Sequence, residues 1–101
     1  MIYPLSVLEA ERARSASEAR SLVGTDLRLW DIARYDDPPA DTIYPREYAY
    51  HLLGDVRGKV VLDLGCGDGK DTTVLARKGA GVIGVDLSWD LLLIAERRVR
   101  E

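Results

Sequence analysis

The sequence has 101 residues, of which 47% are hydrophobic and 31% are charged, and its formal net charge is −3. This length limits the chain to one domain at most, and the composition is that of an ordinary globular protein. Acidic and basic residues are mixed along the chain. This pattern argues against a nucleic-acid-binding protein, because such proteins show a clustered basic excess. A short basic cluster, Arg97, Arg98 and Arg100, is interpreted as a solvated helix face, with a partner or phosphate site as the alternative.

Targeting signals and membrane spans are not recognisable in the sequence. No stretch approaches the roughly 18 consecutive apolar residues of a transmembrane helix. Glu9 and Glu11 interrupt the apolar run that a secretory signal would need. Cys66 is the single cysteine, so it has no partner for an internal disulfide. We therefore predict a cytoplasmic protein with no membrane partner, no nucleic-acid partner and no metal site.

Residues 1–58 are predicted to form a helical segment that leads into a second unit. A helix is expected over residues 5–23, with a weak, alanine-rich apolar stripe and Gly24 as its stop. A second short helical element is expected over residues 26–35, followed by a proline- and aspartate-rich loop over residues 36–41.

A third helix is predicted from Pro45 to Leu53. Proline suits the first turn of a helix, because no hydrogen-bond donor is needed there. Gly54 is the expected end of this helix.

Residues 59–101 alternate between strand and helix patterns. Val60–Leu64 is a short apolar run between glycines, which predicts a buried strand of a parallel sheet. A glycine-rich turn follows, and then a helix to about Lys78 that Asp71 or Thr72 can cap. Gly81 to Asp86 is predicted as a second strand.

A last helix is capped by Ser88 and carries an apolar face at helical spacing, formed by Leu91, Leu92, Ala95 and Val99. Two strands joined by a helix predict a parallel pair and an α/β fold.

A glycine-rich stretch has the features expected of a turn that binds a nucleotide cofactor; it reads Asp63-Leu64-Gly65-Cys66-Gly67-Asp68-Gly69. Glycines permit positive φ and let a ligand approach the backbone, and ligands of open α/β sheets bind beyond the carboxyl ends of the strands. A triphosphate-binding loop is excluded, because Asp71 stands where a magnesium-bound hydroxyl is required. A dinucleotide fingerprint fits weakly, since Lys70 or Thr72 occupies the position of its third glycine or alanine.

This turn resembles that of the class I S-adenosylmethionine-dependent methyltransferases, which reads acid-x-Gly-x-Gly-x-Gly. Their second strand also ends in an acid, and here Asp86 lies 23 positions after Asp63. The resemblance implies a Rossmann-like parallel sheet with helices on both faces. Residues 59–101 would supply only its first β-α-β-α unit, preceded by the N-terminal helices. We accordingly expect an N-terminal fragment or truncated product of such a protein, because the family's core sheet has seven strands.

The resemblance also implies roles for individual residues. Asp63 would lie near the methionine end of the cofactor S-adenosylmethionine, and Gly65 and Gly67 would present backbone to its amino-acid portion. Asp86 would accept hydrogen bonds from both ribose hydroxyls.

Three further residues complete the predicted cofactor site. Gly69 would let the helix start close to the strand, and Leu87 would pack on the adenine. Cys66 is interpreted as a small residue in a tight site, because a nucleophilic cysteine would want a partnered base and His51 is the single histidine.

A purely structural role is the alternative interpretation of several of these residues. Asp63 could cap the turn, and Asp86 could hold nearby turn amides. The aromatic residues before the first strand are interpreted as packing residues, with a cover over the cofactor's sulfonium as the alternative; they are Trp30, Tyr35, Tyr44, Tyr48 and Tyr50.

The implied function is methyl transfer, with a small molecule as the acceptor and no residue assigned as the catalytic base. Two alternatives remain. One is a fragment of an NAD(P)-dependent oxidoreductase. The other is a non-catalytic remnant that self-associates, or binds a partner chain, through an exposed sheet edge.

Overall fold

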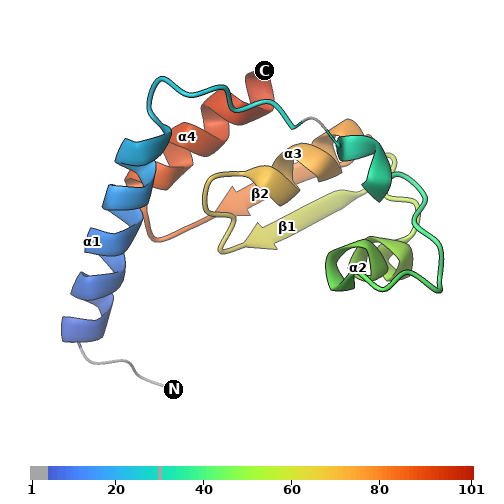
Figure 1. Ribbon diagram of the computed structural model, residues 1–101, viewed down its shortest axis with the longest axis horizontal. Coiled ribbons are helices and arrows are strands. Elements are labelled where there is room, and N and C mark those ends of the chain that lie inside the picture. The colour runs from blue at the N-terminus through green and yellow to red at the C-terminus, as the bar shows by residue number, and fades with distance from the viewer. Residues whose placement is uncertain (1–4, 30) are drawn as a thin grey trace.

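The computed structural model describes residues 5–29 and 31–101, which form an α/β fold (Figure 1). Its elements are α1 (Leu5–Leu22), the 3-10 helix η1 (Ile32–Tyr35), α2 (Pro45–Leu53), β1 (Val60–Leu64), α3 (Lys70–Arg77), β2 (Gly81–Val85) and α4 (Trp89–Arg100). The two strands pair in parallel, with Val60 opposite Gly81 and Leu64 opposite Val85. The predicted β-α-β-α unit is therefore confirmed. No helix in the described part of the chain is long and apolar enough to cross a membrane.

The N-terminal helices follow the prediction except between α1 and η1. The helix expected over residues 26–35 is wrong in its first half, because residues 26–29 are not helical and the 3-10 helix covers only Ile32–Tyr35. The reason is local, because the backbone amide and the side chain of Arg28 both donate to the Asp26 carboxylate. Such a side-chain turn competes with helical hydrogen bonding. Trp30 lies outside the described residues.

Two apolar clusters hold the elements together. In one, Tyr50 of α2 and Val56 pack with Val74 and Leu75 of α3. The strand residues Val61 and Val82, which point to the same side, are packed against this cluster. In the other, Ala19 of α1 packs with Leu27 and with Leu91 and Ile94 of α4. Helix α3 therefore covers one face of the sheet, and α1 is anchored through α4.

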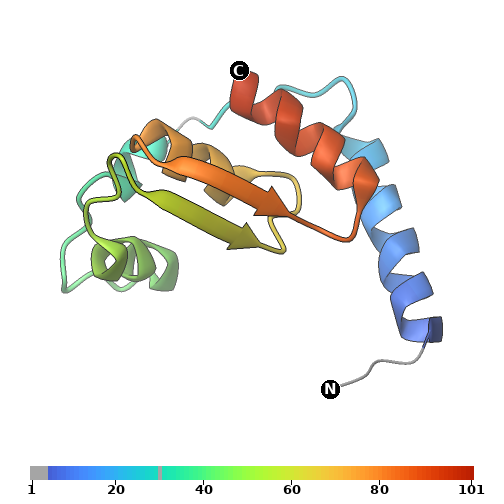
Figure 2. The same cartoon turned by 180° about the vertical axis from the view of Figure 1, so that it is seen from behind.

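The opposite face of the sheet is open. Figure 2 shows both strands in front, with no helix of the described chain across them. The side chains on this face are Val60, Leu62, Leu64, Ile83 and Val85, each between 45% and 77% exposed. The prediction of a buried first strand is thus wrong on this face, because an apolar run shows only that a strand suits burial and not that a covering element is present.

The buried face of α4 differs from the predicted one. Leu91 and Ala95 are buried as expected, but Val99 is 38% exposed, and Ile94 and Arg98 are buried instead. The interpretation of Arg98 as part of a solvated basic face is therefore wrong. Its guanidinium donates to the Leu27 carbonyl and to both the carbonyl and the carboxylate of Asp68. A buried charge is tolerated only when it is satisfied in this way.

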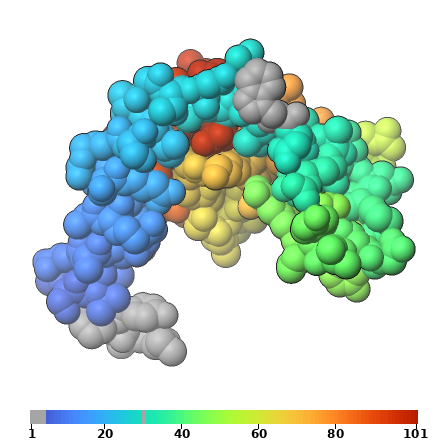
Figure 3. Space-filling model, in the orientation of Figure 1, coloured from blue at the N-terminus to red at the C-terminus, as the bar shows by residue number. Residues whose placement is uncertain are grey.

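Helix α1 projects from the rest of the molecule. Its C-terminal half contacts α4, whereas residues 5–14 are all exposed. Figure 3 shows the surface hollowed between the projecting α1 and α2, with the end of β1 between them. The carboxyl ends of both strands therefore open into a concave region of the molecule.

Candidate cofactor site

The glycine-rich turn connects β1 to α3 at the carboxyl edge of the sheet. Gly65, Gly67 and Gly69 all adopt positive φ, at 70°, 54° and 82°. The backbone amides of Gly65 and Cys66 both donate to the carbonyl of Val85, at 2.7 and 3.0 Å, which ties the turn to the end of β2. A Cβ atom at Gly65 or Gly67 would meet nothing within 4 Å, so open space borders the turn at both positions.

Asp86 lies directly after β2 and bridges the turn to α4. One carboxylate oxygen accepts a hydrogen bond from the amide of Gly67, and the other accepts from the amide of Ser88, both at 2.8 Å. The structural interpretation of Asp86 as an acceptor for turn amides is therefore correct. It does not displace the cofactor interpretation, because a carboxylate offers about four lone-pair sites and these bonds use two.

Gly69 also makes a contact with α4 that the sequence did not predict. A Cβ atom there would lie 2.7 Å from the Cβ of Ala95 and 2.8 Å from its Cα, so the glycine permits close packing against α4. The prediction that Asp71 or Thr72 caps α3 is wrong, because Gly69 is the capping residue and the helix begins at Lys70. The predicted cap of α4 is confirmed, since the Ser88 hydroxyl accepts from the amide of Leu91.

Asp63 and Cys66 flank the turn on its β1 side. The Asp63 carboxylate accepts a hydrogen bond from the Thr72 hydroxyl at 2.7 Å, which joins the end of β1 to α3. Burial, followed by the negative charges of Asp63 and Asp86, raises the pKa of the Cys66 thiol. This thiol therefore stays protonated at neutral pH, which agrees with a packing role and not with a nucleophile.

Two cavities lie near the carboxyl edge of the sheet. One, of about 220 Å³, is bordered by Gly65, Asp86, Leu87 and Ser88 on the sheet side and by α1 on the other. Leu87 is 74% exposed there, so its side chain is available to a ligand. The other, of about 320 Å³, is lined by residues of β1, α2 and α3; they are Arg46, Ala49, Tyr50, Leu53, Asp63, Asp71 and Leu75.

The second cavity contains a polar network that no motif of the sequence marks. One carboxylate oxygen of Asp71 accepts from the guanidinium of Arg46, at 2.7 Å, and from the Tyr50 hydroxyl, also at 2.7 Å. Burial and the hydrogen bond to Asp71 raise the pKa of Tyr50, which keeps the phenol protonated. Asp71 lies 25 positions after Arg46 and 21 after Tyr50, so no local spacing could have shown that it meets these two residues of α2.

Among the aromatic residues before β1, Tyr50 is buried as the packing interpretation expects, whereas Tyr44 and Tyr48 are 53% and 44% exposed. The Tyr35 and Tyr50 rings lie 5.1 Å apart, and Arg34 stacks on Tyr35 and Tyr44. A ring nitrogen of His51 lies 2.9 Å from the carbonyl oxygen of Pro38, in the loop before α2.

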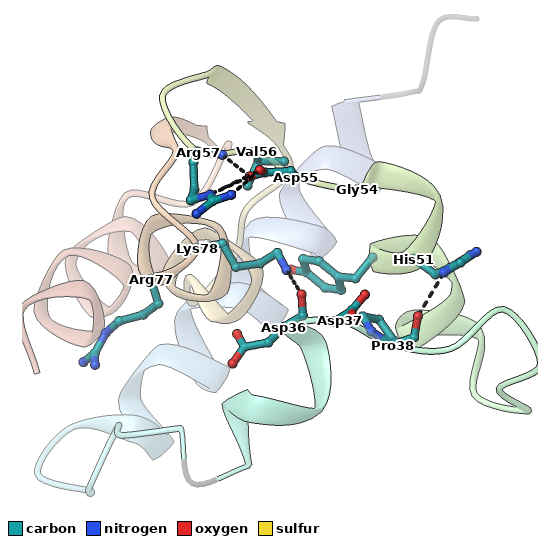
Figure 4. Close-up of a pocket in the computed structure, with 11 residues that line it drawn as sticks. Asp36, Asp37, Pro38, His51, Gly54, Asp55, Val56, Arg57, Arg77 and Lys78 are labelled. Carbon is teal, nitrogen blue, oxygen red and sulfur yellow. Dashed lines mark hydrogen bonds and ion pairs between the residues drawn. The ribbon is translucent and has the colours of Figure 1, made fainter.

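A larger cavity, of about 510 Å³, lies at the opposite edge of the sheet (Figure 4). There Lys78 donates to the carbonyls of Tyr35 and Asp36, and Arg57 pairs with Asp55. The cations on this wall are thus largely engaged by the protein, and the cavity lies away from the glycine-rich turn.

Comparison with known proteins identifies a family for the C-terminal part of the chain. The methyltransferase domain family matches residues 61–101, which begin within β1. A demethylmenaquinone methyltransferase of Tropheryma whipplei (strain Twist) is 44% identical over 55 residues, which is 54% of this chain and 23% of that protein. No solved structure gives a significant match.

Two further relatives are O-methyltransferases. A ubiquinone biosynthesis O-methyltransferase of Salmonella paratyphi A is 37% identical over 76 residues, covering 73% of this chain and 31% of that protein. A magnesium-protoporphyrin O-methyltransferase of Rhodobacter capsulatus is 49% identical over 48 residues, covering 48% of this chain and 21% of that protein. The chain therefore spans less than a third of the length of these curated relatives.

Proposed function

Because residues 61–101 match the methyltransferase domain family, we propose that this chain binds S-adenosylmethionine at the glycine-rich turn. The observation that carries the proposal is the position of Asp86. Its carboxylate lies at the carboxyl edge of two parallel strands, within hydrogen-bond distance of Gly67, and borders a cavity. This edge is where open α/β sheets bind their ligands.

The residues at the turn suit this cofactor. The two unused acceptor sites of Asp86 match a vicinal diol such as the ribose hydroxyls, and the exposed Leu87 offers an apolar surface to adenine. Gly65 and Gly67 leave open space beside the backbone, which the amino-acid portion would occupy. S-adenosylmethionine carries no phosphate, so its binding does not require a lysine or arginine in the turn.

The cavity beside Asp63 suits the methionine end. A methionine end carries a carboxylate and an ammonium group, and this cavity presents a cation, Arg46, together with two carboxylates, Asp63 and Asp71. Asp71 holds the Arg46 guanidinium at 2.7 Å, so the cation is oriented before a ligand arrives. Preorganised charges of this kind reduce the cost of ordering on binding.

We infer that the reaction served by this site is methyl transfer to a small-molecule acceptor. The relatives above support this inference, since their names refer to demethylmenaquinone, ubiquinone biosynthesis and magnesium-protoporphyrin. The bound cofactor supplies an activated methyl group on a sulfonium. The residues of this chain bind and orient that group, and positioning is a major source of rate enhancement.

The test is a calorimetric titration of the chain with S-adenosylhomocysteine, with NADH in a parallel cell. We expect binding of S-adenosylhomocysteine alone. Replacing Asp86 with Ala removes a charged acceptor and should weaken binding by about 1.5–3 kcal/mol, or roughly 10- to 150-fold. Asp41→Ala, in an exposed loop, is the matched control and should leave the affinity unchanged.

Because Asp86 also holds the amides of Gly67 and Ser88, the folding of the variant is checked by circular dichroism. Asp86→Asn keeps one acceptor oxygen and the side-chain shape, and should lose less affinity than the Ala variant. Binding of NADH alone would overturn the proposal, and unchanged affinity in a folded Asp86→Ala variant would remove Asp86 from the site.

A further inference from the structure

The cavity of about 220 Å³ beside Asp86 has a second wall that no motif of the sequence marks. This wall is formed by α1, whose residues Leu8, Arg12 and Ser15 line the cavity together with Asp86 and Leu87. Sites that enclose a whole drug-sized ligand have volumes of about 300–1,000 Å³. This cavity is smaller, so it suits one part of a cofactor and not all of it.

One face of α1 serves both to anchor the helix and to line the cavity. Leu8 lies four residues before Arg12, Ser15 lies three residues after Arg12, and Ala19 lies four residues after Ser15. Residues so spaced lie on the same helix face. Ser15 and Ala19 are each 4% exposed, with Ala19 packed on Leu91 and Ile94 of α4. The same face extends beyond α4 toward the glycine-rich turn, where it carries Arg12 and Leu8.

Arg12 differs from its neighbour Arg14 in its contacts. Arg14 pairs with Glu11 at 2.6 Å and with Glu18 at 2.9 Å. Arg12 makes no hydrogen bond or ion pair with any residue that the structure describes. Its guanidinium is therefore available to a ligand in the cavity, and a guanidinium stacks well on a flat aromatic face.

We propose that α1 forms the second wall of an adenosine site, with Leu8 and Arg12 contacting the adenine from the side opposite Leu87. This inference rests on the proposed function, and it specifies which part of the cofactor enters this cavity. Asp86, at the base of the cavity, would hold the ribose. The methionine end would extend past the turn toward Asp63.

The experiment titrates the full chain with two probes, S-adenosylhomocysteine and 5′-methylthioadenosine, which keeps the adenosine and lacks the amino-acid end. Arg12→Ala should weaken both probes by the same factor, about 2- to 30-fold for a lost cation–π contact. Leu8→Ala should act in the same direction. The matched controls are Leu5→Ala and Arg20→Ala, which lie on α1 outside the cavity and should leave both affinities unchanged.

These variants separate binding from folding. Leu8 is 36% exposed and belongs to the half of α1 that lies outside both apolar clusters, so its truncation should not change the melting temperature. Unchanged affinity in Leu8→Ala and Arg12→Ala, with Asp86→Ala still weakened, would overturn the α1 wall and leave the proposed function standing.

Two other results also count against the α1 wall. Weakening of S-adenosylhomocysteine without weakening of 5′-methylthioadenosine would show that α1 meets the amino-acid end instead. A wild-type chain that binds neither probe would overturn both the α1 wall and the proposed function.

Discussion

Single residues at the turn are constrained by more than one requirement. Gly65 and Gly67 adopt positive φ and border open space. A side chain at either position would therefore strain the backbone and occupy space that a ligand could fill. Gly69 needs positive φ and also lies against Ala95 of α4. Asp86 orders the turn amide of Gly67 before any ligand binds, so a structural role and a binding role coincide in one carboxylate.

The two constraints on Gly69 predict a large loss of stability in Gly69→Ala. A left-handed conformation costs a non-glycine residue roughly 1–2 kcal/mol, and a Cβ atom 2.7 Å from that of Ala95 adds an overpacking cost of about 1–3 kcal/mol. Gly24→Ala is the control, because Gly24 has a φ of 79° and nothing within 4 Å of an added Cβ. Urea unfolding of both variants measures the difference, and equal losses would contradict the packing role.

Among the elements, α4 connects the two halves of the chain. Arg97 and Arg98 of α4 donate to the carbonyls of Thr25 and Leu27, in the segment after α1. Arg98 also holds Asp68 of the glycine-rich turn, at 3.1 Å between guanidinium and carboxylate. The direction of α1, and with it one wall of the cavity beside Asp86, therefore depends on the last turns of α4.

Replacing Arg98 with Met tests this connection. The change leaves the Asp68 carboxylate, whose side chain is 14% exposed, without its main cation. It also leaves the backbone carbonyls of Asp68 and Leu27 without the hydrogen bonds that Arg98 donates. Breaking a buried pair in this way costs about 3–5 kcal/mol. Arg100→Met is the control on the same helix, because Arg100 is 77% exposed and pairs with Glu96 alone among the described residues. Its effect should stay within about 0.5 kcal/mol. Equal unfolding midpoints for the two variants would contradict the prediction.

At the scale of the whole molecule, the sheet is covered on one face and open on the other. Leu62 and Ile83 are each 56% exposed on the open face, whereas Val74 of α3 is fully buried beneath the covered one. Exposed contiguous apolar surface marks an interaction site or a tendency to associate. Pairing of the free sheet edges with a partner chain or a second copy stays a prediction, with edge strands as the physical basis.

The open face predicts binding of the dye ANS and a sedimentation coefficient that rises with protein concentration. The double variant Leu62→Thr/Ile83→Thr should reduce both effects, because threonine keeps the β-branched shape that suits a strand and removes apolar surface. Val74→Thr is the contrasting variant and should instead lower the unfolding midpoint, since it buries a hydroxyl. Dye binding that persists in the double variant would place the apolar surface elsewhere.

The sequence by itself determined the local features of this protein. Strand and helix periods, the glycines, Pro45 and the Ser88 cap are set by neighbouring residues, so the β-α-β-α unit could be predicted. The relation of Asp86 to the turn could also be predicted, because the parallel strands bring their carboxyl ends together.

Only the tertiary structure decided the long-range features. These are the burial of Arg98, the network of Arg46, Tyr50 and Asp71, the open sheet face and the position of α1 beside Asp86. They depend on contacts between residues far apart in the chain. Periodicity shows which side of an element suits burial, but the packing of the elements decides what covers that side.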